Sequence, residues 1–412
     1  MIPGGVVPYN DTVTLLSYKH LRLLNEDIDV VALKGKEDAG ILNNLKNDDN
    51  YKRFHIEYVC DYDDAIASFE RKNVISGVFN IFKYCNYAKK KALSGDYKVV
   101  YTSSVPAFTH MAGYWIKKAL GNKIFWIASI TDTLYKSTYK YDSESFKEYS
   151  LIGKIGFYVY IYIYMNGWYE KICQKYADKV VYICPEQREF MISHYDNQDE
   201  LYKKSMVVPL NYIEDWDIYS KLMVKKEVHN TPKVVSHFGR VYGLRKIDAL
   251  LEALKELKEE DKELDRKIRF EQYGQLLDRY KNRIKEYGIE DIFYYYDKIP
   301  YDEALNKMYD SDVLALYDTF VEEGIQPYLP SKALEYLLLH KDLFVMTPDN
   351  SPSHRIFTEY GYTCVGNDVE QIKEQIKKII NEPTRLHDYD ISQFENEVAT
   401  KELREYIHKC ME

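Results

Sequence analysis

The sequence has few cysteines and no apolar segment of membrane-spanning length. The six cysteines lie far apart and form no Cys-x-x-Cys pair, which argues against a zinc knuckle or a small disulfide scaffold and favours a reducing compartment. No stretch approaches the roughly 18 consecutive apolar residues of a membrane-spanning helix. The first residues, MIPGGVVPYND, have neither the basic nor the apolar region of a signal peptide. We therefore expect a cytoplasmic protein.

Basic side chains are not in excess either. Lys and Arg together number 56 against 65 Asp and Glu, which gives a formal net charge of -9. Because no overall positive field would attract a polyanion, we expect no nucleic-acid partner. The 412 residues, 46% of them hydrophobic, are enough for two or three hydrophobic cores. A disordered or fibrous protein is therefore excluded.

Short apolar runs alternate with helical patterns along both halves of the chain. The runs predict strands at residues 28–33, 54–60, 97–103, 123–129, 179–184, 206–210, 233–238, 268–274, 292–297, 313–318, 342–348 and 362–366. They do not alternate cleanly between apolar and polar residues, which is typical of parallel strands covered on both faces. This order predicts an α/β fold of two doubly wound, Rossmann-like domains.

A polar segment over residues 211–233 separates the two sets of strands. It predicts one domain over residues 1–212 and a second over residues 213–391. Ligands of open parallel sheets bind outside the carboxyl ends of the strands. Two such domains are therefore expected to face one another across an interdomain cleft, and the residues that directly follow the strands are the ones to examine.

The strongest functional signal in the second domain is LPSKALEYLLLH, residues 329–340. Ser331 stands at a predicted helix start, and Lys332 and Glu335 lie three residues apart on one face. A helix start with a lysine favours a phosphate, and a carboxylate one turn later can accept hydrogen bonds from ribose hydroxyls. The alternative is a solvated ion pair on a capped helix, although Leu334 rather than Glu335 occupies the capping-box position.

A second signal is the segment HFGRVYGLRKIDALLEAL, which joins a strand to a helix. Gly239 in its loop permits a tight turn or the close approach of a ligand. Three cations stand near the predicted helix start, namely Arg240, Arg245 and Lys246. We expect Arg240 and Lys246 to neutralise a diphosphate from the side opposite Lys332. The alternative is that they are solvated loop charges.

On these segments the chain resembles the GT-B glycosyltransferases, specifically the retaining family 4 type of bacterial capsule and exopolysaccharide clusters. The resemblance rests on FGRVYGLRKID, PSKALEY, IPYDEALNKMYDSDVLALYD and TPDNSPSHRIFTEYG, and it covers the first domain only in outline. It implies that Arg240, Lys246 and Lys332 contact the donor diphosphate and that Glu335 contacts the ribose. It also implies that a helix over about 392–412 crosses back to the first domain.

The chain departs from this family where the transferred sugar should bind. The common pattern of two glutamates eight residues apart is absent, because Pro327 stands eight residues before Glu335. Two glutamates, at 322 and 323, lie nearby. The loop just before Pro327, which includes Gln326, occupies the place where that sugar is expected, so Gln326 is a candidate contact.

The first domain gives weaker signals. Gly4 and Gly5 resemble the glycine-rich loop that follows the first strand and faces the donor phosphates, but too few residues precede them for a first strand, and a flexible terminus is the alternative. Asp132, in WIASITDTLY, is the candidate that orients or deprotonates the acceptor hydroxyl, although such an aspartate is often a cap. His110 lies on a helical pattern, where a packed histidine is the default.

The resemblance further implies retention by front-face displacement, in which cations and N–H groups stabilise the leaving diphosphate. The chain contains several Asp-x-Asp pairs, but such pairs are frequent in an acidic sequence and we do not interpret them as metal sites. We therefore expect no cofactor and no metal. The expected reaction moves a hexose from a nucleotide diphosphate sugar, UDP ahead of GDP or dTDP, to a hydroxyl of a surface glycan or lipid-linked glycan. A sugar-nucleotide epimerase of the same fold and a non-catalytic GT-B partner subunit remain alternatives.

Aromatic and basic residues also gather in the first domain, at 82–98 and at 155–165 with Trp168 beyond. This combination suits contact with the anionic cytoplasmic face of a membrane, where each lysine contributes roughly 1 kcal/mol. A solvated helix face and a core helix are the alternatives.

Overall fold

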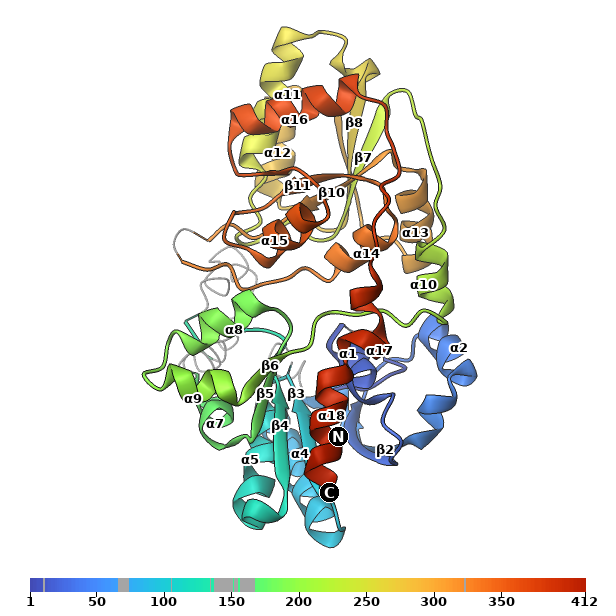
Figure 1. Ribbon diagram of the computed structural model, residues 1–412. Coiled ribbons are helices and arrows are strands. Elements are labelled where there is room, and N and C mark those ends of the chain that lie inside the picture. The colour runs from blue at the N-terminus through green and yellow to red at the C-terminus, as the bar shows by residue number, and fades with distance from the viewer. Residues whose placement is uncertain are drawn as a thin grey trace. The chain divides into compact units, whose positions relative to one another are not determined.

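The computed structural model describes residues 1–9, 12–65, 74–104, 106–133, 135–136, 151, 155, 167–321 and 324–412 (Figure 1). Contacts divide the chain into two compact units. Unit 1 comprises the described residues within 1–136, 151–218 and 392–412, and unit 2 comprises those within 219–391. The main division thus falls between residues 218 and 219, whereas the sequence suggested 212 and 213. The tyrosine-rich segment 156–165 and the glutamates at 322 and 323 lie outside the described residues.

Unit 1 is built on parallel strands. They are β1 (Ile28–Lys34), β2 (Phe54–Asp61), β3 (Val99–Ser103), β4 (Phe125–Ser129), β5 (Lys179–Tyr182) and β6 (Ser205–Val207). The helices are α1 (Thr12–Leu21), α2 (Ala39–Asn47), α3 (Tyr62–Ala65), α4 (Val74–Ser94), α5 (Phe108–Leu120), α7 (Trp168–Tyr176), α8 (Pro185–Ile192), α9 (Gln198–Lys203), α17 (Asn396–Ala399) and α18 (Lys401–Met411). Helix α10 (Asp217–Leu222) spans the division between the units.

The first strand that the sequence did not reveal is present in minimal form at residues 1–4. Ile2 N–H donates to Tyr101 of β3 over 2.8 Å, and Val31 of β1 donates to the Met1 carbonyl over 3.0 Å. Residues 1–4 therefore lie between β1 and β3 and join the pair β1–β2 to the sheet β3–β4–β5–β6. The resulting order is that of a Rossmann sheet. So short a strand, with a proline at position 3, carries no local strand signal.

Unit 2 has a single parallel sheet of order β12–β11–β10–β7–β8–β9, which is again the Rossmann order. Its strands are β7 (Lys233–Phe238), β8 (Ile268–Tyr273), β9 (Phe293–Tyr296), β10 (Val313–Tyr317), β11 (Asp342–Met346) and β12 (Cys364–Val365). Its helices are α11 (Asp248–Glu260), α12 (Asp278–Glu286), α13 (Tyr301–Asp310), α14 (Lys332–Leu338), α15 (Pro352–Glu359) and α16 (Val369–Asn381).

The core of unit 2 lies under α11, α12 and α16, which cover one face of the sheet (Figure 1). Leu250, Leu254 and Leu257 recur at helical spacing on α11 and are buried, so this apolar stripe is the packed face of the helix. The helix begins only at Asp248, however. The cations expected near its first turn therefore lie in the preceding loop.

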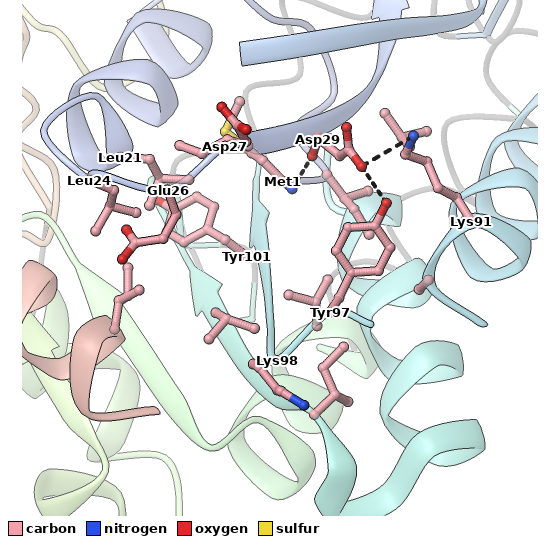
Figure 2. A pocket seen from close by; sticks show the side chains of 18 of the residues that line it. Met1, Leu21, Leu24, Glu26, Asp27, Asp29, Lys91, Tyr97, Lys98 and Tyr101 are labelled. Atoms are coloured by element: carbon pink, nitrogen blue, oxygen red, sulfur yellow. Dashed lines mark hydrogen bonds and ion pairs between the residues drawn. The ribbon is translucent and has the colours of Figure 1, made fainter. Parts of the chain in front are cut away.

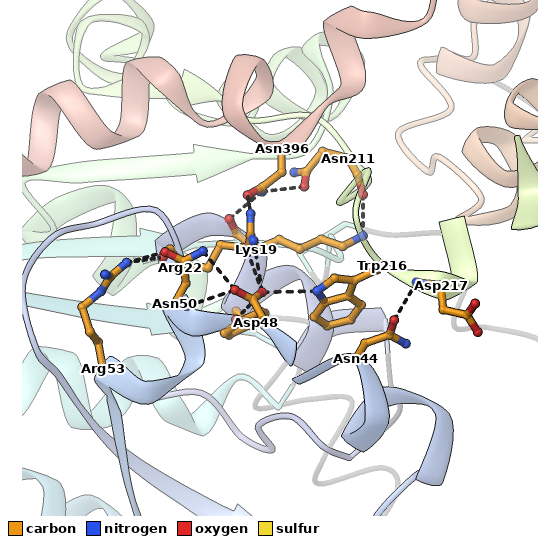
Figure 3. A network of polar contacts seen from close by, with 11 residues as sticks. Lys19, Arg22, Asn44, Asp48, Asn50, Arg53, Asn211, Trp216, Asp217 and Asn396 are labelled. Carbon is orange, nitrogen blue, oxygen red and sulfur yellow. Dashed lines mark hydrogen bonds and ion pairs between the residues drawn. The ribbon is translucent and has the colours of Figure 1, made fainter. Parts of the chain in front are cut away.

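A buried polar network holds separate segments of unit 1 together (Figure 3). Asp48 accepts hydrogen bonds from Trp216 Nε1 over 3.2 Å and from Arg22 Nε over 3.1 Å. Arg22 Nη1 also donates to Asn396 Oδ1 over 3.2 Å. The first residue of α17 is thereby tied to the residue that follows α1. Through Asp48, both are linked to Trp216, the residue before α10.

None of the described helices combines the length and the apolar character that crossing a membrane would require.

Candidate functional site

The loops after β7, β10 and β11 leave the carboxyl edge of the unit 2 sheet, where ligands of such sheets bind. The loop after β7 is tethered to β8, because Gly239 N–H donates to the Tyr273 carbonyl and Gln272 Nε2 donates to the Gly239 carbonyl. A Cβ on Gly239 would lie 3.1 Å from His237 Nε2. Gly239 thus allows the backbone to pass close to a buried histidine.

His237 is the buried centre of this region. Its exposure is 3%, its Nδ1 donates to the Ala315 carbonyl over 2.8 Å, and its ring stacks on Tyr317. Burial, followed by the nearby charges of Arg245 and Lys332, lowers the pKa of His237 to about 3. The ring is therefore neutral at pH 7 and leaves Nε2 as an acceptor without a hydrogen-bond partner among the described residues.

The three cations of the β7–α11 loop differ in their placement. Arg245 is half-buried, and its charge acts on His237 and on the buried carboxylate of Asp318. Arg240 is exposed, and its carbonyl accepts a hydrogen bond from Arg245 Nη1 over 3.1 Å. Lys246 is half-buried like Arg245. The sequence predicts Arg240 and Lys246 as donor contacts, and both stay predictions. Arg245 is a third candidate because its charge acts on His237 and Asp318.

Lys332 and Glu335 form the first turn of α14. Their side chains, 28% and 21% exposed, make an ion pair of 3.2 Å between Nζ and Oε2. Ser331 precedes the helix and makes no side-chain capping hydrogen bond. Since the charge of Lys332 also acts on His237, the same buried ring is influenced by Lys332 from the start of α14 and by Arg245 from the β7–α11 loop. The sequence alone did not reveal that Lys332 and Arg245 act on the same histidine.

Asp318 is a further polar residue of the site that the sequence analysis did not select. It directly follows β10, is fully buried, and accepts hydrogen bonds from Gln326 Nε2 over 2.8 Å and from Thr347 Oγ1 over 2.9 Å. Burial raises the pKa of its carboxyl group. Gln326, expected to contact a sugar, instead has its side chain bound to Asp318 and to Tyr328 N–H. The sequence did hold one signal that could have revealed Asp318, because it is a polar residue directly after a buried strand.

The candidate residues of unit 1 are packed to different degrees. Gly4 and Gly5 are buried, and a Cβ on Gly4 would collide with the ring of Pro106. His110 is buried on α5, where its Nδ1 shares a hydrogen bond of 2.8 Å with Thr102, and burial lowers its pKa to about 3. Asp132 is exposed in the loop after β4. Of the unit 1 candidates, it is the one whose carboxylate solvent reaches.

No three His, Cys, Asp or Glu side chains converge as metal ligands within the part of the chain that the structure describes. The expectation of a metal-independent reaction remains a prediction.

Residues 220–393, essentially unit 2, match the model of the family glycosyl transferases group 1. No curated protein sequence matches the chain. Solved structures do. The chain is similar to sucrose-phosphate synthase from Thermosynechococcus elongatus, with 13% identity and a TM-score of 0.59 over 99% of this chain and 94% of that one.

Two further solved structures are similar over nearly their whole length. One is the lipopolysaccharide outer core galactosyltransferase WaaB in its apo form, with 13% identity and a TM-score of 0.57 over 99% of this chain and 98% of that one. The other is the E. coli trehalose-6-phosphate protein bound with UDP-2-fluoro glucose, with 10% identity and a TM-score of 0.56 over 99% of this chain and 95% of that one.

These similarities confirm the predicted fold class, which is the GT-B fold with two Rossmann-like domains. Within that fold, residues 220–393 are similar to the glycosyl transferases group 1 family. The resemblance stated from the sequence is thus confirmed at this coarser level. Assignment to family 4 and to capsule synthesis stays a prediction.

Proposed function

We propose that the chain is a retaining glycosyltransferase that moves a hexose from a nucleotide diphosphate sugar, most simply a UDP-sugar, to a hydroxyl of a surface-glycan acceptor. The group 1 domain and the GT-B fold support transfer from a nucleotide sugar. Because one similar structure binds UDP-2-fluoro glucose, UDP is the first donor nucleotide to test.

One observation carries the proposal. In the matched domain, Arg245 and Lys332 act on the same buried histidine, and Glu335 stands one turn after Lys332. Two partly buried cations whose charges both act on one ring suit a diphosphate, whose negative charge grows as the sugar leaves. Binding of the phosphates would break the ion pair between Lys332 and Glu335. The Glu335 carboxylate would then be free to accept hydrogen bonds from the ribose hydroxyls. The donor is thus held by protein cations, and we propose that no metal is needed.

The acceptor side of the proposal rests on unit 1. Asp132 follows β4 in an exposed loop at the carboxyl edge of that sheet, so its carboxylate can reach a hydroxyl from solvent. We assign it the orientation or deprotonation of the acceptor. His110 is too deeply buried and too weakly basic for that task, and we assign it to packing.

A membrane surface is the proposed partner of unit 1. Phe79 and Phe82 on α4 are 68% and 46% exposed, and Lys83 and Lys90 lie on the same exposed face. Aromatic side chains beside lysines suit an anionic lipid surface. A lipid-linked acceptor would then meet the enzyme at the cytoplasmic face of a membrane.

The test is calorimetric binding of UDP to the full chain, with and without EDTA. We expect Lys332→Ala and Arg245→Ala each to weaken binding by about tenfold or more, because each removes a charged hydrogen bond worth about 1.5–3 kcal/mol. Lys281→Ala is the matched control, since Lys281 also pairs with an acid three residues away, Asp278. Arg240→Ala and Lys246→Ala test the two loop contacts with the diphosphate that the sequence predicts.

Three outcomes would contradict the proposal. Equal UDP affinity in the wild type, Lys332→Ala and Arg245→Ala would remove the donor site. Failure to bind any nucleoside diphosphate would favour a non-catalytic subunit. Conversion of a UDP-sugar to its epimer without an acceptor would favour the epimerase.

A further inference from the structure

A pocket of about 270 Å³ lies within unit 1, at the amino-terminal ends of β1 and β3 (Figure 2). Ile28 and Val99, the first residues of these strands, line it. Helix α4 contributes Ala92, and α18 contributes Ile407 and Met411. Ligands of parallel sheets bind at the opposite, carboxyl ends of the strands. The pocket is therefore separate from the proposed donor and acceptor sites.

The walls of the pocket are mostly apolar. Side chains from every surrounding element contribute, among them Leu21, Leu24, Val31, Ala88, Val100 and Ile124. The ring of Tyr101 also faces it, while its hydroxyl group is held by His20 Nδ1 over 2.6 Å. A cavity lined in this way favours an apolar occupant over water.

The polar groups on one side of the pocket are satisfied within the protein. Asp29 accepts a hydrogen bond from Tyr97 and forms an ion pair of 3.4 Å with Lys91 (Figure 2). Lys91 also pairs with Glu57 over 2.6 Å. Because each of these groups already has a partner within the protein, none of them is free to bind an ionic group deep in the pocket.

The rim has an excess of carboxylates. Glu26, Asp27 and Asp96 stand there with a single lysine, Lys98, which pairs with Asp96 over 3.0 Å. Glu26 Oε1 lies 3.4 Å from His408 Nδ1, whereas its buried Oε2 has no hydrogen-bond partner among the described residues. A head group at this rim would therefore be repelled if anionic and held if it donates hydrogen bonds.

We propose that the pocket binds a single-chain amphiphile whose alkyl chain enters between α4 and α18 and whose head is not anionic and donates hydrogen bonds at the rim. The chain would cover the apolar side chains of the wall. A bound alkyl chain would also stabilise the packing of α18, because Ile407 and Met411 form one side of the pocket. This ligand is additional to the nucleotide sugar and its acceptor.

The test uses three probes with the same ten-carbon chain, each below its micelle concentration: decyl maltoside, decylamine and decanoate. For the full chain we expect the first two to raise the Tm by a few degrees in a saturable way and decanoate to leave it unchanged. Ala92→Leu fills the pocket and should weaken decyl maltoside binding at least tenfold. Asn86→Leu, on the exposed face of the same helix, is the matched control.

Equal binding of decyl maltoside to the wild type and to Ala92→Leu would overturn the proposal, as would equal binding of decanoate. A second measurement applies if Ala92→Leu does not fold. An alkyl diazirine maltoside is photolysed with the wild-type chain and the labelled peptides are mapped. Labels on Leu24, Ala92 or Met411 support the site, whereas labels confined to Phe79 and Phe82 on the outer face of α4 overturn it.

Discussion

Three of the buried histidines have strongly lowered pKa values, which affects how the chain responds to acid. His20, His110 and His237 are each 3% exposed or less, and burial lowers the pKa of each to about 3. Each folded-state pKa lies below the unfolded value of 6.5, so protons bind the unfolded chain more tightly. The neutral rings therefore leave the free energy of unfolding undiminished above pH 6.5, and this free energy falls as the pH is lowered toward 3.

We therefore expect the urea midpoint to fall between pH 7.5 and pH 5, because each such histidine costs about 1.4 kcal/mol per pH unit within its window. His110→Gln, which can still hydrogen-bond to Thr102, should reduce this pH dependence. His55→Gln is the control, since the His55 side chain is 56% exposed. An unchanged slope in His110→Gln would show that the buried ring is charged or solvated.

At the scale of elements, strands were predicted well because runs covered on both faces leave a strong local pattern. All the predicted strand segments contain or overlap β1–β12. Residues 1–4 were missed because their strand is defined by pairing with Tyr101 and Val31, which lie far away in the sequence. The cations of the β7–α11 loop can be named from the sequence, but the sequence does not reveal that the charge of Arg245 acts on the buried His237, and that is why Arg245 was passed over.

Helix α4 carries the proposed membrane contact, and its exposed face can be tested directly. Phe79→Ser and Phe82→Ser should each weaken binding to vesicles containing anionic lipid by about tenfold, because burying a phenylalanine contributes roughly 1.5–3 kcal/mol. Val224→Ser is the control, since Val224 is 58% exposed but lies outside α4. Cosedimentation measures the binding. Equal partition of all three variants and the wild type would reject α4 as the contact.

At the scale of the whole molecule, unit 1 depends on segments from both ends of the chain. Asp48 sits where they meet, with Tyr18, Arg22 and Trp216 donating to its carboxylate (Figure 3). The pKa of Asp48 is lowered; burial opposes this shift, but hydrogen bonds and the charge of Arg22 outweigh it. The network therefore strengthens above the unfolded pKa of an aspartate and weakens as the pH falls below it.

Asp48→Ala should lower the free energy of unfolding by about 3–5 kcal/mol, because it leaves Arg22 buried without its partner. Asp49→Ala is the matched control. The neighbouring Asp49 side chain is 91% exposed and pairs with Lys52, so its loss should change stability by less than about 0.5 kcal/mol. Urea unfolding of both variants measures the difference. Similar losses in the two would mean that the network contributes little.

The return of residues 392–412 to unit 1 has a consequence for how the chain is made on the ribosome. Domains usually fold in the order of their synthesis, the N-terminal one first. Here unit 2 is fully synthesised once residue 391 has been added, whereas unit 1 still lacks α17 and α18. Most of unit 1 is therefore synthesised before unit 2, but it lacks its last two helices until residues 392–412 have been added.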